Sequence, residues 1–253
     1  MTQSLLWAAG GTGFTFLMTS LGAAVVFFFR RQVTASAQRI FLGFAAGVMI
    51  AASVWSLLIP AIEEAEGAGQ VGWVPAAGGF VLGVAFLMAL DGILPHLHPG
   101  AREPEGARSK LHRTTLLIFA VTLHNIPEGM VIGAAFASGE AGSGWVMAAV
   151  IGLHNVPEGM AVAAPLTAGG TQWWRAASLA AVTGAPTVLG AILGFWVGTL
   201  GPAALSAALS FASGAMLYVV FGELLPEAVG LWRGRAPALA AVAGVVVGMW
   251  IAG

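Results

Sequence analysis

The sequence contains no cysteine and few charged residues. Charged side chains make up 8% of its 253 residues, against about 25% in an average soluble domain, and hydrophobic side chains make up 58%. The lack of cysteine excludes disulfides and removes thiolate as a metal ligand, which leaves imidazole, carboxylate, thioether, amide and carbonyl groups. A net charge of −1 points to no nucleic-acid partner. The shortage of charge therefore excludes a water-soluble domain and indicates helices in a lipid bilayer, where glycine-rich apolar segments are common.

Eight apolar segments are long enough to cross a hydrocarbon core of about 30 Å, which needs about 20 helical residues. They cover 4–29, 39–62, 71–94, 114–138, 143–167, 174–199, 203–229 and 236–252. The first run is too long for the apolar part of a cleaved signal peptide, so we expect a retained span. The predicted fold class is an all-α polytopic membrane protein.

The ten lysines and arginines all lie in or beside the odd-numbered connections, and the even-numbered ones carry none. Because short cytoplasmic loops are enriched in these residues, both termini are predicted to lie outside. Glu63, Glu64, Glu66 and Glu140 fall in the predicted outer loops. We expect this acidic outer face to concentrate cations.

An internal repeat relates the second segment to the seventh. Residues 44–61 align without gaps on residues 211–228, and they share phenylalanine, glycine, methionine and two leucines. The two copies are an odd number of spans apart, so they cross the membrane in opposite directions, as in transporters built from inverted repeats. Chance similarity between apolar helices is the alternative. The predicted organisation is one transporter domain, 1–253, with repeat one at 1–94, a cytoplasmic loop at 95–113, a central helix pair at 114–167 and repeat two at 174–253.

A second duplication places polar residues at the centres of two spans. LHNIPEGM occupies 123–130 and LHNVPEGM occupies 153–160, identical at seven of eight positions. A charged residue at a span centre costs about 2.5–3.5 kcal/mol, and an interior proline costs about 3 kcal/mol. Nothing structural requires that cost twice, so the motif indicates a functional site.

The spacing places the polar groups on one face of each helix. His124 and Glu128 are four residues apart, with Asn125 beside them, and His154, Asn155 and Glu158 repeat this arrangement. Pro127 and Pro157 would each release a backbone carbonyl, so that the helices can kink. As antiparallel neighbours, the two helices bring two imidazoles, two carboxylates and two amides together. A divalent cation compensates this set best, with Zn²⁺ foremost and Fe²⁺, Mn²⁺, Co²⁺ and Cd²⁺ as alternatives.

Other interpretations of the motif remain open. A hydrogen-bonded polar cluster would hold two helices together, and buried His and Glu also form proton relays without metal. An intramembrane metal-dependent hydrolase would use Glu128 or Glu158 as general base, but the HExxH order is missing. A metal sensor or structural subunit would lack an output domain. We expect a transporter rather than an enzyme, with no cofactor beyond its metal substrate, acting as a monomer or as a homodimer.

At these residues the chain resembles the prokaryotic branch of the ZIP (Zrt-, Irt-like protein) family of metal transporters. The resemblance covers the whole chain and rests on the eight spans, the long third loop and the paired HN-x-P-E-G motif. It implies a 3+2+3 helix arrangement, with the central pair enclosed by the inverted repeats. It also implies zinc uptake into the cytoplasm by a multi-pass protein of the cell membrane, the inner membrane in a prokaryote.

The resemblance also implies a ligand set. His124, Glu128 and Glu158 look like ligands of a primary site, and Met49 matches a methionine that adds a thioether, with ordinary apolar packing as its alternative. Asn125 and Asn155 match an adjacent second site that shares the two glutamates. His154 stands at a variable position, so its role as a ligand is open.

One departure concerns the sixth span. Family members carry a glutamate just before its proline, where this sequence has Ala185 before Pro186. Alanine cannot coordinate a metal, so we expect the second site to be weakened or absent. Near the cytoplasmic side, Glu223 and Glu227 could pass ions onward or be solvated helix-end charges. The loop histidines could bind metal transiently or be inert: His96, His98 and His112.

The charge pattern predicts which loops face outward. A cysteine introduced at Gly69 or Gly142 should react with an impermeant thiol reagent on intact cells, because both positions lie in loops that lack lysine and arginine. A cysteine at Gly106 or Gly234 should react only after the cells are permeabilised. The opposite labelling pattern would reverse the orientation.

Overall fold

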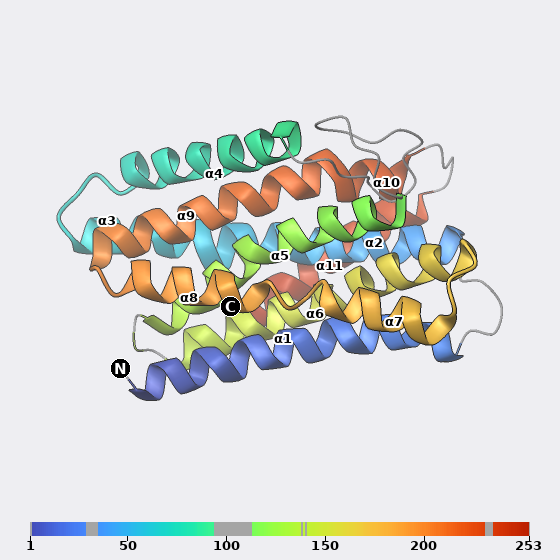
Figure 1. Cartoon of the computed structure of the whole chain (residues 1–253). Helices are drawn as coiled ribbons and strands as arrows, with labels where there is room; N and C mark the ends of the chain where they lie inside the picture. Colours follow the sequence, from blue (N-terminus) through green and yellow to red (C-terminus); the bar gives the residue numbers. More distant parts are fainter. Residues whose placement is uncertain are drawn as a thin grey trace.

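The computed structural model describes residues 2–28, 35–93, 113–137, 139, 141–230 and 235–252, and every regular element in these ranges is helical. The helices lie side by side along a common direction (Figure 1). A bundle of this kind satisfies every backbone hydrogen bond within each helix, which is what a lipid environment requires. Their bounds are α1 Thr2–Phe28, α2 Ala35–Ala51, η1 Ala52–Leu58, α3 Ile59–Gly67, α4 Trp73–Ile93, α5 Arg113–Ala137, α6 Ala141–Ala168, α7 Trp173–Val182, α8 Thr187–Gly198, α9 Pro202–Val219, η2 Val220–Leu224, α10 Leu225–Val229 and α11 Ala236–Ala252.

Each of the eight apolar segments predicted from the sequence coincides with a helical stretch. Among the described residues, six stretches are long and apolar enough to cross a membrane: Thr2–Phe28, Ser36–Gly67, Trp73–Ile93, Ala141–Ala168, Trp173–Gly198 and Pro202–Val229. Helix α11 is apolar but shorter. The all-helical polytopic membrane class is therefore confirmed, while eight crossings with both termini outside stay a prediction.

Three local features were not predicted from the sequence. The second and seventh stretches each contain a π-helical turn, η1 and η2, which ends just before Pro60 or Pro226. Proline offers no N–H to the preceding turn, and π-turns are a common adjustment inside α-helices. The sixth stretch is divided by turns at 183–186 that end at Pro186. Helices α5 and α6, in contrast, continue through Pro127 and Pro157.

The two π-turns occupy matching positions in the internal repeat. Shifting 52–58 by the offset of the gap-free alignment gives 219–225, which contains η2 at Val220–Leu224. The packing also matches. A side chain at Gly47 of α2 would overlap the Ala241 carbonyl of α11, and one at the aligned Gly214 of α9 would overlap the Phe80 carbonyl of α4. Helix α2 thus packs on α11 as α9 packs on α4.

The central helices α5 and α6 make a second matched pair of contacts. Helix α1 packs against α6, and α8 packs against α5. The contacts form at glycines, because a side chain at Gly22 of α1 would overlap the Val156 carbonyl, and one at Gly190 of α8 would overlap the Ile126 carbonyl. Val156 and Ile126 are the same position in the two motif copies. The motif helices are thus held at equivalent points by two outer helices.

Close backbone contact between α1 and α6 requires glycine at position 22. We expect Gly22→Val to reduce folded yield and thermal stability, because its Cβ would overlap the backbone of Val156, and overpacking costs typically about 1–3 kcal/mol. Gly13→Val on the same helix is the matched control, since its Cβ would meet open space. The measurement is a size-exclusion melting curve in detergent. Equal melting temperatures for the two variants would contradict the contact.

Candidate metal centre

Glu128, His154 and Glu158 form a buried cluster where the two motif copies meet. Nε2 of His154 on α6 lies 2.8 Å from Oε1 of Glu128 on α5, and each side chain is 2% exposed. One ligand atom from each of the three residues lies within 4.8 Å of the others. Oxygen and nitrogen ligands sit about 2.0–2.2 Å from Zn²⁺, so small side-chain movements would let all three hold one ion. His154, whose role as a ligand the sequence left open, lies inside this cluster, and a ligand role for it stays a prediction.

Glu158 is held by an amide from the other motif. Asn125 Nδ2 on α5 donates to Glu158 Oε1 at 2.8 Å and to the Val121 carbonyl at 3.0 Å. The Oδ1 atom of Asn125 accepts a hydrogen bond of 3.1 Å from Thr187 Oγ1. The second oxygen of Glu158, Oε2, is buried without a hydrogen bond to the described residues. A buried carboxylate oxygen without a donor is a ready metal ligand.

Glu128 has the equivalent partner. Both ends of the Asn155 amide have hydrogen-bond partners in one orientation. Nδ2 then donates to the Ile151 carbonyl at 2.8 Å and to Glu128 Oε2 at 3.3 Å, and the amide oxygen accepts from Thr19 Oγ1 at 3.1 Å. Asn125 and Asn155 therefore share three kinds of contact, and in this orientation the nitrogen of Asn155 also lies 3.0 Å from His154 Nε2. The sequence placed both asparagines at the site as metal ligands, whereas in the structure their NH₂ groups face the carboxylates.

His124 lies in a neighbouring cluster. Its Nε2 atom is 3.0 Å from Glu223 Oε1, and Asp91 of α4 brings a third ligand atom within 4.8 Å of theirs. The sequence grouped His124 with Glu128 and Glu158, and the structure separates them into adjoining clusters. Asp91 was missed, although it is the only aspartate in the chain and stands in an apolar helix, which was the available signal.

One cavity joins the two clusters. It has a volume of about 50 Å³ for the centres of water-sized molecules, enough for several waters, since one needs about 10–15 Å³. Its lining includes Met49, all three residues of the first cluster, His124 and Glu223 of the second and, at the end of the seventh stretch, Glu227: Leu42, Ala45, Met49, Val121, His124, Glu128, His154, Glu158, Ala161, Val219, Glu223, Leu224 and Glu227. Met49 is 3% exposed and belongs to both this lining and the apolar core.

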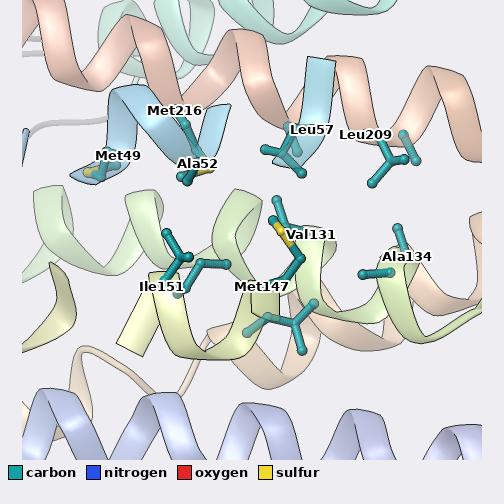
Figure 2. Packing of buried hydrophobic residues seen from close by; sticks show 14 of the residues in the cluster. Met49, Ala52, Leu57, Val131, Ala134, Met147, Ile151, Leu209 and Met216 are labelled. Carbon is teal, nitrogen blue, oxygen red and sulfur yellow. The ribbon is translucent and has the colours of Figure 1, made fainter. Parts of the chain in front are cut away.

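Apolar side chains separate this cavity from a second one. Figure 2 shows them between the helices, with Met49, Ala52 and Met216 facing Val131 and Ile151. Beyond them lies a cavity of about 680 Å³ whose lining includes Glu63 and Glu64 of α3. In chain order along α6, His154 lines the first cavity, Ile151 lies in the apolar layer and Met147 lines the second.

The segment around Ala185 differs from the expectation. Ala185 is exposed, whereas Thr187, two residues on, is 1% exposed and bonds to Asn125. Position 185 therefore does not place its side chain beside the paired motifs, and Thr187 is the residue of this segment that reaches them. The loop histidines His96, His98 and His112 lie outside the described residues.

Comparisons with known proteins find relatives over most of the chain. A family model described as ZIP Zinc transporter matches residues 104–253. Zinc transporter ZIP11 of Homo sapiens is 34% identical, with 98% of this chain and 96% of the relative aligned. Zinc transporter GufA of Myxococcus xanthus is 39% identical over 83% of each chain. Zinc transporter ZIPB of Bordetella bronchiseptica is 35% identical over 87% of this chain and 72% of the relative.

Replacing the sulfur of Met49 separates its two interpretations. Met49→Leu keeps the apolar volume, and a soft thioether favours soft cations, so the variant should lose on the order of 10-fold in Cd²⁺ affinity and little in Mn²⁺ affinity. Met216→Leu is the matched control, because Met216 is equally buried in the same core but does not line the cavity. Isothermal titration measures both ions. An unchanged Cd²⁺ affinity would leave Met49 with a packing role alone.

Proposed function

Because the chain belongs to the ZIP zinc transporter family, we propose that it transports divalent transition metal ions, zinc foremost, through the Glu128–His154–Glu158 cluster. The observation that carries the proposal is the convergence of two nearly identical motifs on buried carboxylates beside a cavity. An unpaired buried carboxylate is costly, and a divalent cation compensates two at once.

The substrate is assigned from the donor set and from the relatives. Imidazole and carboxylate ligands without thiolate suit Zn²⁺ and leave Fe²⁺, Mn²⁺, Co²⁺ and Cd²⁺ as competitors. Three relatives covering most of this chain carry the name zinc transporter. Glu128, Glu158 and His154 form the resting site, with Met49 at its edge. The adjoining His124, Asp91 and Glu223 receive the ion on its way along the cavity toward Glu227.

The proposed architecture is a 3+2+3 arrangement with both termini outside. Repeat one, 1–94, and repeat two, 174–253, enclose the central pair, 114–167, and the loop 95–113 is cytoplasmic. Support comes from the aligned π-turns and from the matched packing of α1 on α6 with α8 on α5. It also comes from Figure 1, where the α3–α4 and α8–α9 connections lie at one end and the α6–α7 connection lies at the other.

Uptake into the cytoplasm is the proposed direction. The cavity that contains Glu63 and Glu64 lies at the end with the predicted outer loops, where acidic side chains attract cations. The apolar layer around Ile151 and Val131 closes the metal cluster from that side. The described conformation is therefore one in which an ion at Glu128 and Glu158 is separated from the outer cavity, and alternating access moves this layer.

Removing one carboxylate tests the site. Glu128→Ala and Glu158→Ala should each lose at least on the order of 10–100-fold in Zn²⁺ affinity, because that loss is typical even for residues that only hydrogen-bond to a metal ligand. Both variants should also lose most Zn²⁺ uptake into proteoliposomes. Glu66→Ala is the control, because Glu66 is an exposed glutamate of α3 outside both cavity linings.

The same assay distinguishes the rival functions. Normal Zn²⁺ uptake by both Glu variants would place the transport site elsewhere in the chain. Zn²⁺ binding without any uptake by the wild type, together with loss of a hydrolytic activity in Glu128→Ala, would favour the intramembrane hydrolase.

A further inference from the structure

The two threonines Thr19 and Thr187 occupy equivalent positions around the metal centre. Thr19 of α1 is fully buried and Thr187 of α8 is 1% exposed. Thr187 Oγ1 donates to Asn125 Oδ1 at 3.1 Å. Thr19 Oγ1 lies 3.1 Å from the Asn155 amide oxygen, in the orientation that satisfies both ends of that amide, and 3.2 Å from the Thr15 carbonyl of its own helix. Neither threonine is in a motif, and neither lines the cavity.

The single glycine of each motif allows this contact between threonine and asparagine. A side chain at Gly129 would overlap the Thr187 carbonyl, and one at Gly159 would overlap the Thr19 carbonyl. Each of these glycines directly follows a cluster glutamate, so close backbone packing there brings a threonine beside the asparagine three residues before that glutamate. The same packing rule therefore builds both Thr–Asn pairs.

The contacts fix which end of each amide faces the carboxylates. A backbone carbonyl and a carboxylate only accept hydrogen bonds, so the atom of Asn125 that faces the Val121 carbonyl and Glu158 must be Nδ2. Oδ1 is then directed to Thr187, whose hydroxyl donates to it. Asn155 follows the same logic with Ile151, Glu128 and Thr19. An NH₂ group has no lone pair for a cation, whereas the amide oxygen does.

We propose that Thr19 and Thr187 are positioning residues that hold the amide oxygens of Asn155 and Asn125 away from the carboxylates, so that the centre binds a single divalent cation. The inference rests on the proposed function of the Glu128–His154–Glu158 cluster. The asparagines act as clamps on the carboxylates rather than as ligands. A second cation beside them would require both amides to rotate by half a turn, which breaks the hydrogen bonds of each amide to its backbone carbonyl and to its carboxylate and takes its oxygen away from the threonine donor.

Removing the hydroxyls tests the positioning role. Thr19→Val/Thr187→Val keeps the side-chain volume and leaves both amide oxygens without a donor, so the amides become free to present oxygen to a cation. Bound Zn²⁺, measured by equilibrium dialysis with elemental analysis, should rise from about one ion per chain in the wild type toward two in the double variant. His96, His98 and His112 of the loop and His124 of the adjoining cluster are replaced in every protein, so that the ion count reports the Glu128–His154–Glu158 centre alone.

Matched controls separate positioning from simple packing. Thr15→Val/Thr183→Val removes two equally buried hydroxyls from the same two stretches, but these donate to the carbonyls of Thr12 and Ala180 and not to the site. This control should bind like the wild type. Thr19→Ser/Thr187→Ser keeps the donors and should restore single occupancy. If the valine variant does not fold, Thr19→Ala/Thr187→Ala replaces it.

The outcomes are distinct. A hydroxyl-free variant that binds one Zn²⁺ with wild-type affinity, at a centre that Glu128→Ala still abolishes, overturns the positioning role and leaves the proposed function intact. A wild type that already holds two ions at the centre also overturns it, because the asparagines would then be ligands despite the threonines. A wild type without Zn²⁺ at the centre overturns the proposed function and this inference together.

Discussion

The structure depends on keeping two glutamates in an apolar interior. Glu128 is 2% exposed, and Glu158 has one oxygen without a hydrogen bond to the described residues. A buried carboxylate is unfavourable unless charges or donors compensate it, so the chain surrounds these two with His154 and the amides of Asn125 and Asn155. This requirement also explains the glycines at the helix contacts. The hydroxyl groups of α1 and α8 can reach the asparagine amides only where the helix backbones are in direct contact.

The symmetry of the site has the same origin. The two copies of the motif face each other, so the asparagine amide of each copy donates a hydrogen bond to the glutamate of the other. The outer helices repeat this relation, with Thr19 serving one copy and Thr187 the other. The symmetry ends at His124 and His154. His154 pairs with Glu128 inside the cluster, while His124 turns to Glu223 and Asp91 in the adjoining one.

Much of this was predictable from the sequence, because lipid imposes long apolar helices and makes buried polar residues conspicuous. The helical segments and the convergence of the two motifs follow from those rules, whereas the place of Met49 beside the cluster was expected from the family resemblance alone. Three features did not. The partner of His124 depends on how α4 and α9 approach α5. The exposure of Ala185 depends on the turns at 183–186, which a continuous helix pattern conceals. Thr19 and Thr187 look like ordinary residues of apolar helices, since a hydroxyl there usually bonds to its own helix.

A transporter must also release its ion, and the hydrogen bonds around Glu128 and Glu158 bear on that step. His154 and the two amides already satisfy three of the four oxygens of Glu128 and Glu158. An arriving cation therefore replaces existing contacts instead of meeting bare charge, which lowers the net gain on binding. After the ion leaves, the same donors return, and the empty site stays compensated. Conduction requires binding that is favourable enough to admit an ion and weak enough to release it, and the clamped carboxylates meet both demands.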